Sequence, residues 1–193
     1  MSAKNIKDQL VEAAMELAQE QEWAAVSLAD IARRCGLSES EVYNYAEDKE
    51  DILILTSRMI DRHVAENTQE FNGEDESFVS QRDRLFDVLM ERFDILNEYR
   101  PALLSILKSL RADPKKAALS APHLCRSMNR MLELAGIPAD GLRGAAKAAA
   151  LTAIYLKTLK VWKDDDSPDM SQTMAALDKD LGHAERLAGL FRL

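Results

Sequence analysis

The segment GLSESEVYNYAEDKEDIL, residues 36–53, has the polar residues and spacing of a short helix suited to the major groove of DNA. Its charge opposes that use, because residues 38–48 carry four acids and no Lys or Arg. The four acids are Glu39, Glu41, Glu47 and Asp48. A carboxylate about 7 Å from a phosphate costs about 0.6 kcal/mol in bulk water, so sequence-independent DNA binding should be almost absent. Specific contacts stay open, since Glu accepts from cytosine N4 and Asn pairs with adenine.

Helix caps predict the elements that position this segment. Ser27, followed by Asp30, predicts an N-cap with a carboxylate at the third helical position. The helix that follows should end at Gly36, because glycine readily adopts the left-handed conformation of a sharp turn. A short helix and a sharp turn therefore precede the acidic segment.

Two further caps delimit the acidic helix itself. Ser38 and Glu41 form an S-x-x-E capping box, which predicts a helix through about Tyr45. Asp48 and Asp51 repeat this device at the start of a longer helix that breaks near residues 71–73. The acids thus have two interpretations: they cap and start helices, or some of them contact bases.

Apolar residues recur at three- and four-residue spacing along the chain, and no alternating strand pattern occurs. With seven Gly and five Pro, this predicts an all-α fold of about nine helices. Other helices are expected over about residues 3–21, 78–97, 101–110, 116–135 and 142–163. Ser167 should cap a final helix that begins at Pro168, and Trp23 should fill a small N-terminal core.

The net charge of −8 argues against a general attraction to nucleic acid or anionic membranes. Residues 1–50 contribute −6 of it, from five bases and eleven acids. No apolar run approaches the roughly 18 to 20 residues of a membrane span, and no signal peptide is evident, so a cytoplasmic protein is expected. Cys35 and Cys125 are expected to be reduced thiols.

The stretch LVEAAMELAQEQEWAAVSLADIARRCGLSESEVYNYAEDKEDIL resembles the DNA-binding domain of the TetR family of transcriptional regulators, over about residues 6–56. The resemblance rests on the AA.EL helix and on the S..DIA...G.S...VY.Y...K..L frame. It implies a TetR-like fold, with a three-helix helix-turn-helix domain at residues 1–50 and a helical ligand-binding and dimerisation domain at residues 51–193. It also implies a homodimer that binds operator DNA and responds to a small, apolar effector.

The resemblance places eight residues at the DNA surface, and two arginines of the preceding helix are added as candidates from the sequence itself. Ser27, Tyr43, Tyr45 and Lys49 fall where members commonly contact phosphates, Glu39, Ser40, Glu41 and Asn44 fall where bases are read, and Arg33 and Arg34 either face phosphate or end a solvated helix. Tyr43 and Tyr45 are two positions apart, so one should pack inward and the other reach outward. Members often carry Lys or Arg at the positions of Glu39 or Asn44, which this chain does not.

The stretch YLKTLKVWKDDDSPDMSQTMAALDKDLGHAERL is similar to the end of the ubiquinone-biosynthesis accessory protein family that shares the TetR fold. The shared features are a W-x-x-D pattern followed by T-x-x-x-L-D. This resemblance implies a lipid-binding protein that keeps the fold and does not act as a repressor. It is the alternative to the DNA-binding regulator.

Two further groups of residues follow from the helical pattern. A ligand pocket, or simply a filled core, is expected around Phe86, Met90, Phe93, Tyr99, Leu103, Leu107, Met128, Met131, Tyr155 and Leu159. A homodimer interface between the last two helices, or packing within the subunit, is expected at Ala145, Ala149, Thr152, Leu177, Leu181, Ala184, Ala188 and Phe191.

Catalytic and metal-binding patterns are lacking in the sequence. His63, His123 and His183 lie far apart, and none belongs to an HxxxH or HExxH spacing. The DDDSPD stretch lacks the ligand periodicity and central Gly of a calcium loop, so a solvated loop is favoured. We therefore expect no enzyme, no metal and no cofactor.

Overall fold

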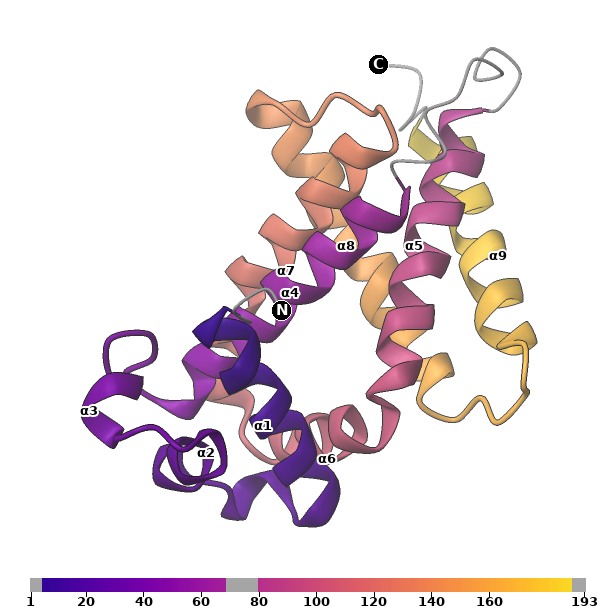
Figure 1. The fold of residues 1–193 in the computed structure, drawn as a ribbon. Helices are drawn as coiled ribbons and strands as arrows, with labels where there is room; N and C mark the ends of the chain where they lie inside the picture. The colour runs from indigo at the N-terminus through magenta and orange to yellow at the C-terminus, as the bar shows by residue number, and fades with distance from the viewer. Residues whose placement is uncertain (1–4, 69–79, 189–193) are drawn as a thin grey trace. The chain divides into compact units, whose positions relative to one another are not determined.

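The computed structural model describes residues 5–68 and 80–188, without the side chains of residues 116, 117, 187 and 188. Within these residues the chain forms nine α-helices and one turn of 3-10 helix, and no strand (Figure 1). The all-α prediction is therefore confirmed. None of the helices in the described ranges combines the length and apolarity needed to cross a bilayer.

The helices follow the predicted ranges closely. They are α1 (Ile6–Glu20), α2 (Leu28–Cys35), α3 (Glu39–Val42), α4 (Lys49–Thr68), α5 (Gln81–Glu98), α6 (Arg100–Ala112), α7 (Pro114–Leu134), α8 (Gly141–Trp162) and α9 (Ser171–Ala188), with η1 (Trp23–Ala25) between α1 and α2. The expected break near residues 71–73 lies outside the described residues.

The chain forms two compact units, and neither is continuous in sequence. The first unit comprises Met1–Ile60 and Leu96–His123, and the second comprises Asp61–Ile95 and Leu124–Leu193. The helix-turn-helix segment therefore shares a unit with α6, which lies far along the chain. The predicted functional division between residues 50 and 51 stays a prediction.

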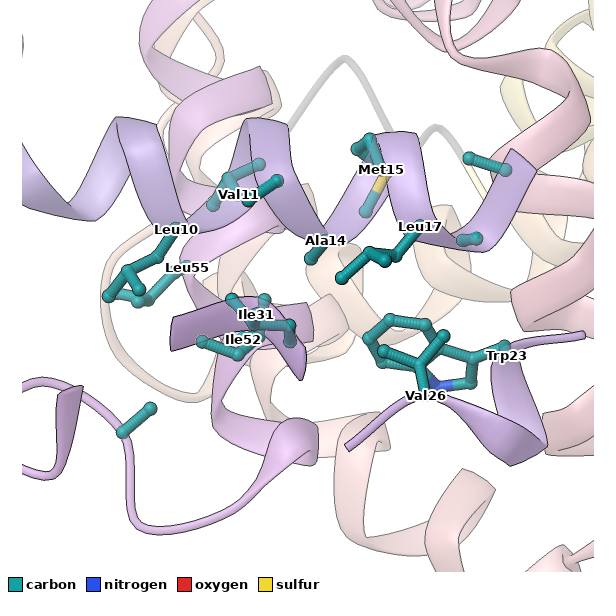
Figure 2. Close-up of a cluster of buried hydrophobic side chains, with 14 of the residues drawn as sticks. Leu10, Val11, Ala14, Met15, Leu17, Trp23, Val26, Ile31, Ile52 and Leu55 are labelled. Atoms are coloured by element: carbon teal, nitrogen blue, oxygen red, sulfur yellow. The ribbon is translucent and has the colours of Figure 1, made fainter. Parts of the chain in front are cut away.

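The first unit packs its helices around one apolar core. Figure 2 shows side chains of α1 lined up above Ile31 of α2, Ile52 of α4, and Trp23 and Val26 of the segment between α1 and α2. The core comprises Leu10, Val11, Ala13, Ala14, Met15, Leu17, Ala18, Trp23, Val26, Ile31, Ala32, Val42, Ala46, Ile52, Leu55, Met59, Ala102 and Ile106. The predicted role of Trp23 is confirmed, since the side chain is buried and its backbone N–H donates to Ser105 Oγ at 2.9 Å.

The acidic helix is shorter than the sequence predicted. It was expected through about Tyr45, but α3 ends at Val42. The backbone then tightens, because the N–H groups of Asn44 and Tyr45 donate to carbonyls three residues back, at 3.3 and 2.8 Å. This tighter turn brings Ala46 into the core. Burial of Ala46 thus accompanies the early end of the helix.

The final helix begins at Ser171, three residues later than Pro168, where it was predicted to start. Met170 causes the interruption, because its φ of 51° is left-handed and non-helical. Asp165 organises the loop before it and is buried, not solvated as predicted. Its carboxylate accepts from the N–H and hydroxyl of both Ser167 and Thr173, at 2.5 to 3.1 Å.

A close backbone contact joins the α7–α8 loop to α8. A Cβ atom added to Gly144 would lie 2.0 Å from the carbonyl carbon and oxygen of Ala139. Only glycine allows this approach. Lys147, one turn further along α8, is also buried, and its Nζ donates to the carbonyl of Pro138 at 3.2 Å. The loop is therefore fixed against the first turns of α8.

Asp165→Asn should destabilise the protein at pH 7 by about 2 kcal/mol, measured by chemical unfolding. Burial raises the pKa of Asp165, but the hydrogen bonds from Ser167 and Thr173 outweigh it and lower the pKa to about 2. The stabilisation is complete above the ordinary value of 3.8 and is lost as the pH falls from about 4 toward 2. Asp164→Asn, at an exposed carboxylate beside Lys163, is the control and should have little effect. Equal losses in the two variants would contradict this account.

Gly144→Ala should lower the free energy of unfolding by on the order of 3 kcal/mol, because the new methyl group collides with backbone that cannot move aside cheaply. Gly182→Ala in α9 is the matched control, since nothing lies within 4 Å of a Cβ atom there. That change should stabilise the protein by about 0.5–1 kcal/mol, as a helix interior favours Ala over Gly. Guanidinium unfolding of both variants measures the contrast, and a neutral Gly144→Ala variant would refute the close approach.

Candidate functional site

The turn between α2 and α3 has the geometry of a helix-turn-helix. Gly36 has a φ of 69°, and its N–H donates to the carbonyl of Arg33 at 3.2 Å. The next residue, Leu37, donates its N–H to the carbonyl of Ala32 at 3.0 Å and packs against the core. These bonds satisfy the carbonyls at the end of α2 and fix the direction in which α3 leaves. The prediction for Gly36 is therefore confirmed.

Both predicted capping boxes are present, and they engage the serine hydroxyls. Ser27 Oγ donates to Asp30 at 2.6 Å, and Ser38 Oγ donates to Glu41 at 2.7 Å. The hydroxyl and backbone hydrogen bonds from the serines lower the pKa of Asp30 and of Glu41. The hydroxyl proton of Ser27, which was expected to contact phosphate, is thus already donated within the unit.

The caps at the start of α4 follow the same pattern. The Asp48 carboxylate accepts from the N–H of Asp51 at 3.0 Å, and the Asp51 carboxylate accepts from the N–H of Glu47 at 2.8 Å. Glu41, Asp48 and Asp51 therefore act as helix-starting residues, as one of the two interpretations predicts. Because they act at helix starts, their negative charges stay at the surface of the first unit.

Lys49, expected to contact phosphate, is a structural anchor of the first unit. Its Nζ donates to the backbone carbonyls of Trp23, Ala24 and Val26 at 2.8, 3.2 and 2.9 Å. The ammonium also lies 5.3 Å from the centre of the Trp23 ring, in a cation–π contact. The positive charge is thus turned toward the η1 segment.

The two arginines of α2 are also paired within the unit. Arg34 donates to Glu16 at 3.0 Å and to Glu20 at 2.5 and 2.9 Å, and these carboxylates raise the pKa of Arg34. Glu16 and Glu20 lie one turn apart on α1, which presents both to Arg34. Arg33 pairs with Asp30 at 3.0 Å, but 76% of its side chain is exposed, so this contact is weak and easily exchanged.

The remaining predicted DNA contacts divide between surface and core. Glu39, Ser40 and Asn44 are exposed on α3 and the turn after it. Tyr43 is 55% exposed, whereas Tyr45 is partly buried and packs against the core. The prediction that one tyrosine packs inward is confirmed. The face formed by α3 and the following turn is acidic, and the two basic residues that precede it, Arg33 and Arg34, are both paired with carboxylates.

The second unit contains a buried ionic cluster that sequence analysis did not identify. Arg92 of α5 is buried, with 3% of its side chain exposed, and its Nη1 donates to Asp61 of α4. Ser127 of α7 donates its hydroxyl to the same carboxylate at 2.5 Å, and Arg92 Nε donates to Tyr155 Oη of α8 at 3.2 Å. Burial disfavours the charged guanidinium, but Tyr155 and Asp61 outweigh it, and the pKa of Arg92 is raised. A signal existed in the sequence, because Arg92 continues the apolar spacing of Leu85, Val88 and Leu89.

The predicted pocket residues fall in both units. Tyr99, Leu103 and Leu107 belong to the first unit, where Tyr99 and Leu103 pack against its core. Phe86, Met90, Phe93, Met128, Met131, Tyr155 and Leu159 belong to the second. There the rings of Phe93 and Tyr155 stack with centroids 5.4 Å apart, and Trp162 lies 6.5 Å from Phe93. The second-unit residues remain the candidate ligand site.

The residues predicted to form the dimer interface differ in how far they are buried. Leu177 and Leu181 are fully buried within this chain, so they pack inside the subunit and present no surface to a second copy. Ala145 and Ala149 are exposed, and Thr152 and Ala184 are half-buried. The side chains of Ala188 and Phe191 lie outside the described residues. A dimer through the exposed α8 positions stays a prediction.

The fold of this chain is similar to that of known proteins. Residues 10–55 match the family described as bacterial regulatory proteins, tetR family. The TetR transcriptional regulator from Nitrosomonas europaea ATCC 19718 has a TM-score of 0.73 at 23% identity, covering 95% of this chain and 100% of that one. FadR from Bacillus subtilis, solved in complex with stearoyl-CoA, has a TM-score of 0.58 at 18% identity, covering 90% and 97%. The fold is TetR-like.

A second similarity extends over nearly the whole chain. Residues 117–188 match the COQ9 family. The chain is 26% identical over 192 residues to the mitochondrial ubiquinone biosynthesis protein COQ9 of Rattus norvegicus, covering 95% of this chain. The chain spans about 60% of the length of that relative. The two resemblances seen in the sequence thus each correspond to a family match.

Lys49→Met should lower the free energy of unfolding by about 2–3 kcal/mol, because the carbonyls of residues 23–26 lose a charged donor in a partly buried site. Lys7→Met, on the exposed side of α1, removes the same charge and should change stability by less than about 0.5 kcal/mol. Thermal or denaturant unfolding distinguishes the two. A Lys49→Met variant as stable as Lys7→Met would show that the anchor contributes nothing.

Proposed function

We propose that this chain is a non-catalytic, lipid-binding protein of the COQ9 type, which keeps the TetR-like fold without binding DNA. The observation that carries the proposal concerns the helix-turn-helix head, residues 27–49: its basic side chains are paired within the protein. Of the bases between residues 27 and 49, Lys49 donates to three carbonyls, Arg34 is held by two carboxylates, and Arg33 pairs with Asp30. The carboxylates of Glu39, Glu41, Glu47 and Asp48, by contrast, are exposed.

Electrostatics explains why this state disfavours DNA. Non-specific binding depends on cations that displace counterions from phosphates and is worth only about 5.5–8 kcal/mol. Each exposed carboxylate near the backbone opposes it, by about 0.6 kcal/mol at 7 Å in bulk water and by more where water is excluded. Freeing Lys49 or Arg34 for a phosphate would break hydrogen bonds within the unit. The head therefore lacks the sequence-independent attraction on which operator search depends.

The lipid assignment is supported by similarity and by the composition of the second unit. The chain aligns with rat COQ9 along 95% of its length, and the COQ9 family match covers residues 117–188, whereas the regulator family match covers residues 10–55. The resemblance to the accessory-protein family implies a lipid ligand. The second unit offers Met90, Met128 and Met131 together with Phe93 and Tyr155 as an adaptable apolar interior.

Operator binding by a ligand-responsive homodimer is the second candidate function. It is favoured by the complete helix-turn-helix geometry and by the exposure of Glu39, Ser40 and Asn44 on the face where bases would be read. Glu39 could accept from cytosine N4 and Asn44 could pair with adenine. Such a complex would be specific, with few phosphate contacts and a shallow salt dependence.

Fluorescence anisotropy with DNA from around the protein's own gene tests the two candidates. At about 50 and about 200 mM salt, the unmodified protein should bind neither this DNA nor an unrelated duplex. Glu39→Lys/Glu47→Lys should gain weak, non-specific binding that is lost at the higher salt, because it changes charges that cap no helix. Mass spectrometry of organic extracts of the purified protein should detect bound lipid.

The control variant is Glu98→Lys/Glu185→Lys, which makes the same change in net charge at exposed positions of α5 and α9, outside the helix-turn-helix segment. It should gain no DNA affinity. Sequence-selective binding by the unmodified protein, together with lipid-free extracts, would overturn the proposal and favour the regulator. DNA affinity that rises equally in both charge variants would show that α3 has no special role.

A further inference from the structure

The first half of α7, residues 114–123, is an exposed helical segment of the first unit. From residue 111 to residue 126, none of the described side chains is buried. Leu119 is 74% exposed, and Ala118, Ala121 and Pro122 beside it are exposed as well. Most of the stability of a helix in a protein comes from packing of its apolar face. A segment of this kind therefore gains stability from a partner that covers it.

The exposed segment is basic, although the chain as a whole is acidic. Residues 100–123 carry five Lys or Arg and one acid, Asp113, whereas the whole chain has a net charge of −8. Arg111, at the end of α6, and Lys115, at the start of α7, are both exposed. Leu119 follows Lys115 by one helical turn, so an exposed apolar side chain lies next to positive charge. We call Arg111, Lys115 and Leu119 the α7 surface.

The helix-turn-helix head has a surface with the opposite charge. Glu39 and Glu47 are exposed on α3 and the turn after it, and Tyr43 between them is 55% exposed. We call these three residues the α3 surface. Among the described residues of the first unit, Tyr43 and Leu119 are the large apolar side chains that remain exposed. Each of them lies among charges of one sign, and the two signs are opposite.

A second copy of the chain matches both surfaces at once. In a dimer with two-fold symmetry, every contact between two different residues occurs twice, so each α7 surface can meet the α3 surface of the other copy. A symmetric contact of α7 with α7 would instead place positive charges against their own copies, which repulsion disfavours. An anionic bilayer fits less well, because residues 1–60 of the same unit carry twelve acids and six bases and would be repelled.

We propose that the α7 surface of one copy docks against the α3 surface of a second copy, through opposite charges and the apolar side chain within each surface. The contact uses residues of the first unit, so it is distinct from the predicted dimer through α8. It also does not depend on the proposed lipid binding. Because both surfaces are small, the association should be weak.

Sedimentation velocity of the full chain tests this association. The weight-average mass is measured between about 10 and about 500 µM protein, at about 50 and about 500 mM salt. The parent should associate at the lower salt. Its dissociation constant should rise by on the order of tenfold at the higher salt, because exposed charges are screened.

Two charge-reversed variants test which surfaces meet. Arg111→Glu/Lys115→Glu makes the α7 surface acidic, and Glu39→Lys/Glu47→Lys makes the α3 surface basic. Each variant alone should lose the salt-sensitive association, since its two surfaces then carry charge of the same sign. An equimolar mixture of the two should regain it. In the mixed dimer one contact has the original charges and the other has both charges reversed, so the two contacts are again attractive.

Three further variants serve as controls. Leu119→Ser should weaken self-association several-fold and leave the free energy of unfolding nearly unchanged, because the side chain is exposed. Lys7→Glu/Lys179→Glu, at exposed positions of α1 and α9, makes the same change in net charge as the α7 variant. Glu98→Lys/Glu185→Lys does so for the α3 variant. Both charge controls should keep most of the association of the parent.

Three outcomes overturn the inference. A parent mass that is the same at both salts shows that no such contact forms, whether the protein is a monomer or a dimer held elsewhere. A mixture that associates no more than either variant alone shows that the two surfaces do not meet. If the parent does not self-associate but co-sediments with phosphatidylglycerol vesicles, and Arg111→Glu/Lys115→Glu does not, an anionic bilayer covers the α7 surface. Lipid retention is measured separately, so failure of this contact leaves the proposed function standing.

Discussion

The contact between the Lys49 ammonium and the carbonyls of Trp23, Ala24 and Val26 anchors α4 to the segment that leads into α2. These carbonyls belong to a 3-10 turn and to the extended residue after it, so they need a donor from elsewhere. Lys49 supplies that donor from α4, and Trp23 can then enter the core while the chain proceeds directly to the cap of α2. The same contact withdraws a positive charge from the surface beside α3. The contact that fixes the entry to α2 therefore also leaves one positive charge fewer to offset the acids of α3.

Charged side chains of the second unit also have partners within the protein, and they are more deeply buried. Asp165 is held by Ser167 and Thr173 and fixes the connection between α8 and α9. Asp180, also buried, pairs with Lys157 across the same two helices at 2.6 Å. These carboxylates have their hydrogen bonds satisfied within the unit. The cluster around Arg92 follows the same rule, because Arg92 and Ser127 both donate to the Asp61 carboxylate within the unit.

In this protein the TetR-like fold does not by itself imply DNA binding. The head keeps the caps, the left-handed glycine and the core of a TetR-like domain, because these features are required for the three helices to pack at all. None of them requires a cationic surface. A protein can therefore retain the fold while exchanging the charges that attract DNA, and similarity to both a regulator family and COQ9 is physically consistent.

The sequence by itself determined the helices, their caps, the turn at Gly36, the burial of Trp23 and the opposite environments of Tyr43 and Tyr45. Such features depend on residues within about four positions of each other, so local spacing is enough. Only the tertiary structure decided which partner each charge has: Lys49 with residues 23–26, Arg34 with α1, and Arg92 with α4 and α8. It also decided that Leu177 and Leu181 pack inside the chain. An apolar stripe or a charged residue looks the same in sequence whether its partner is solvent, another helix or another molecule, because that choice depends on contacts between distant segments.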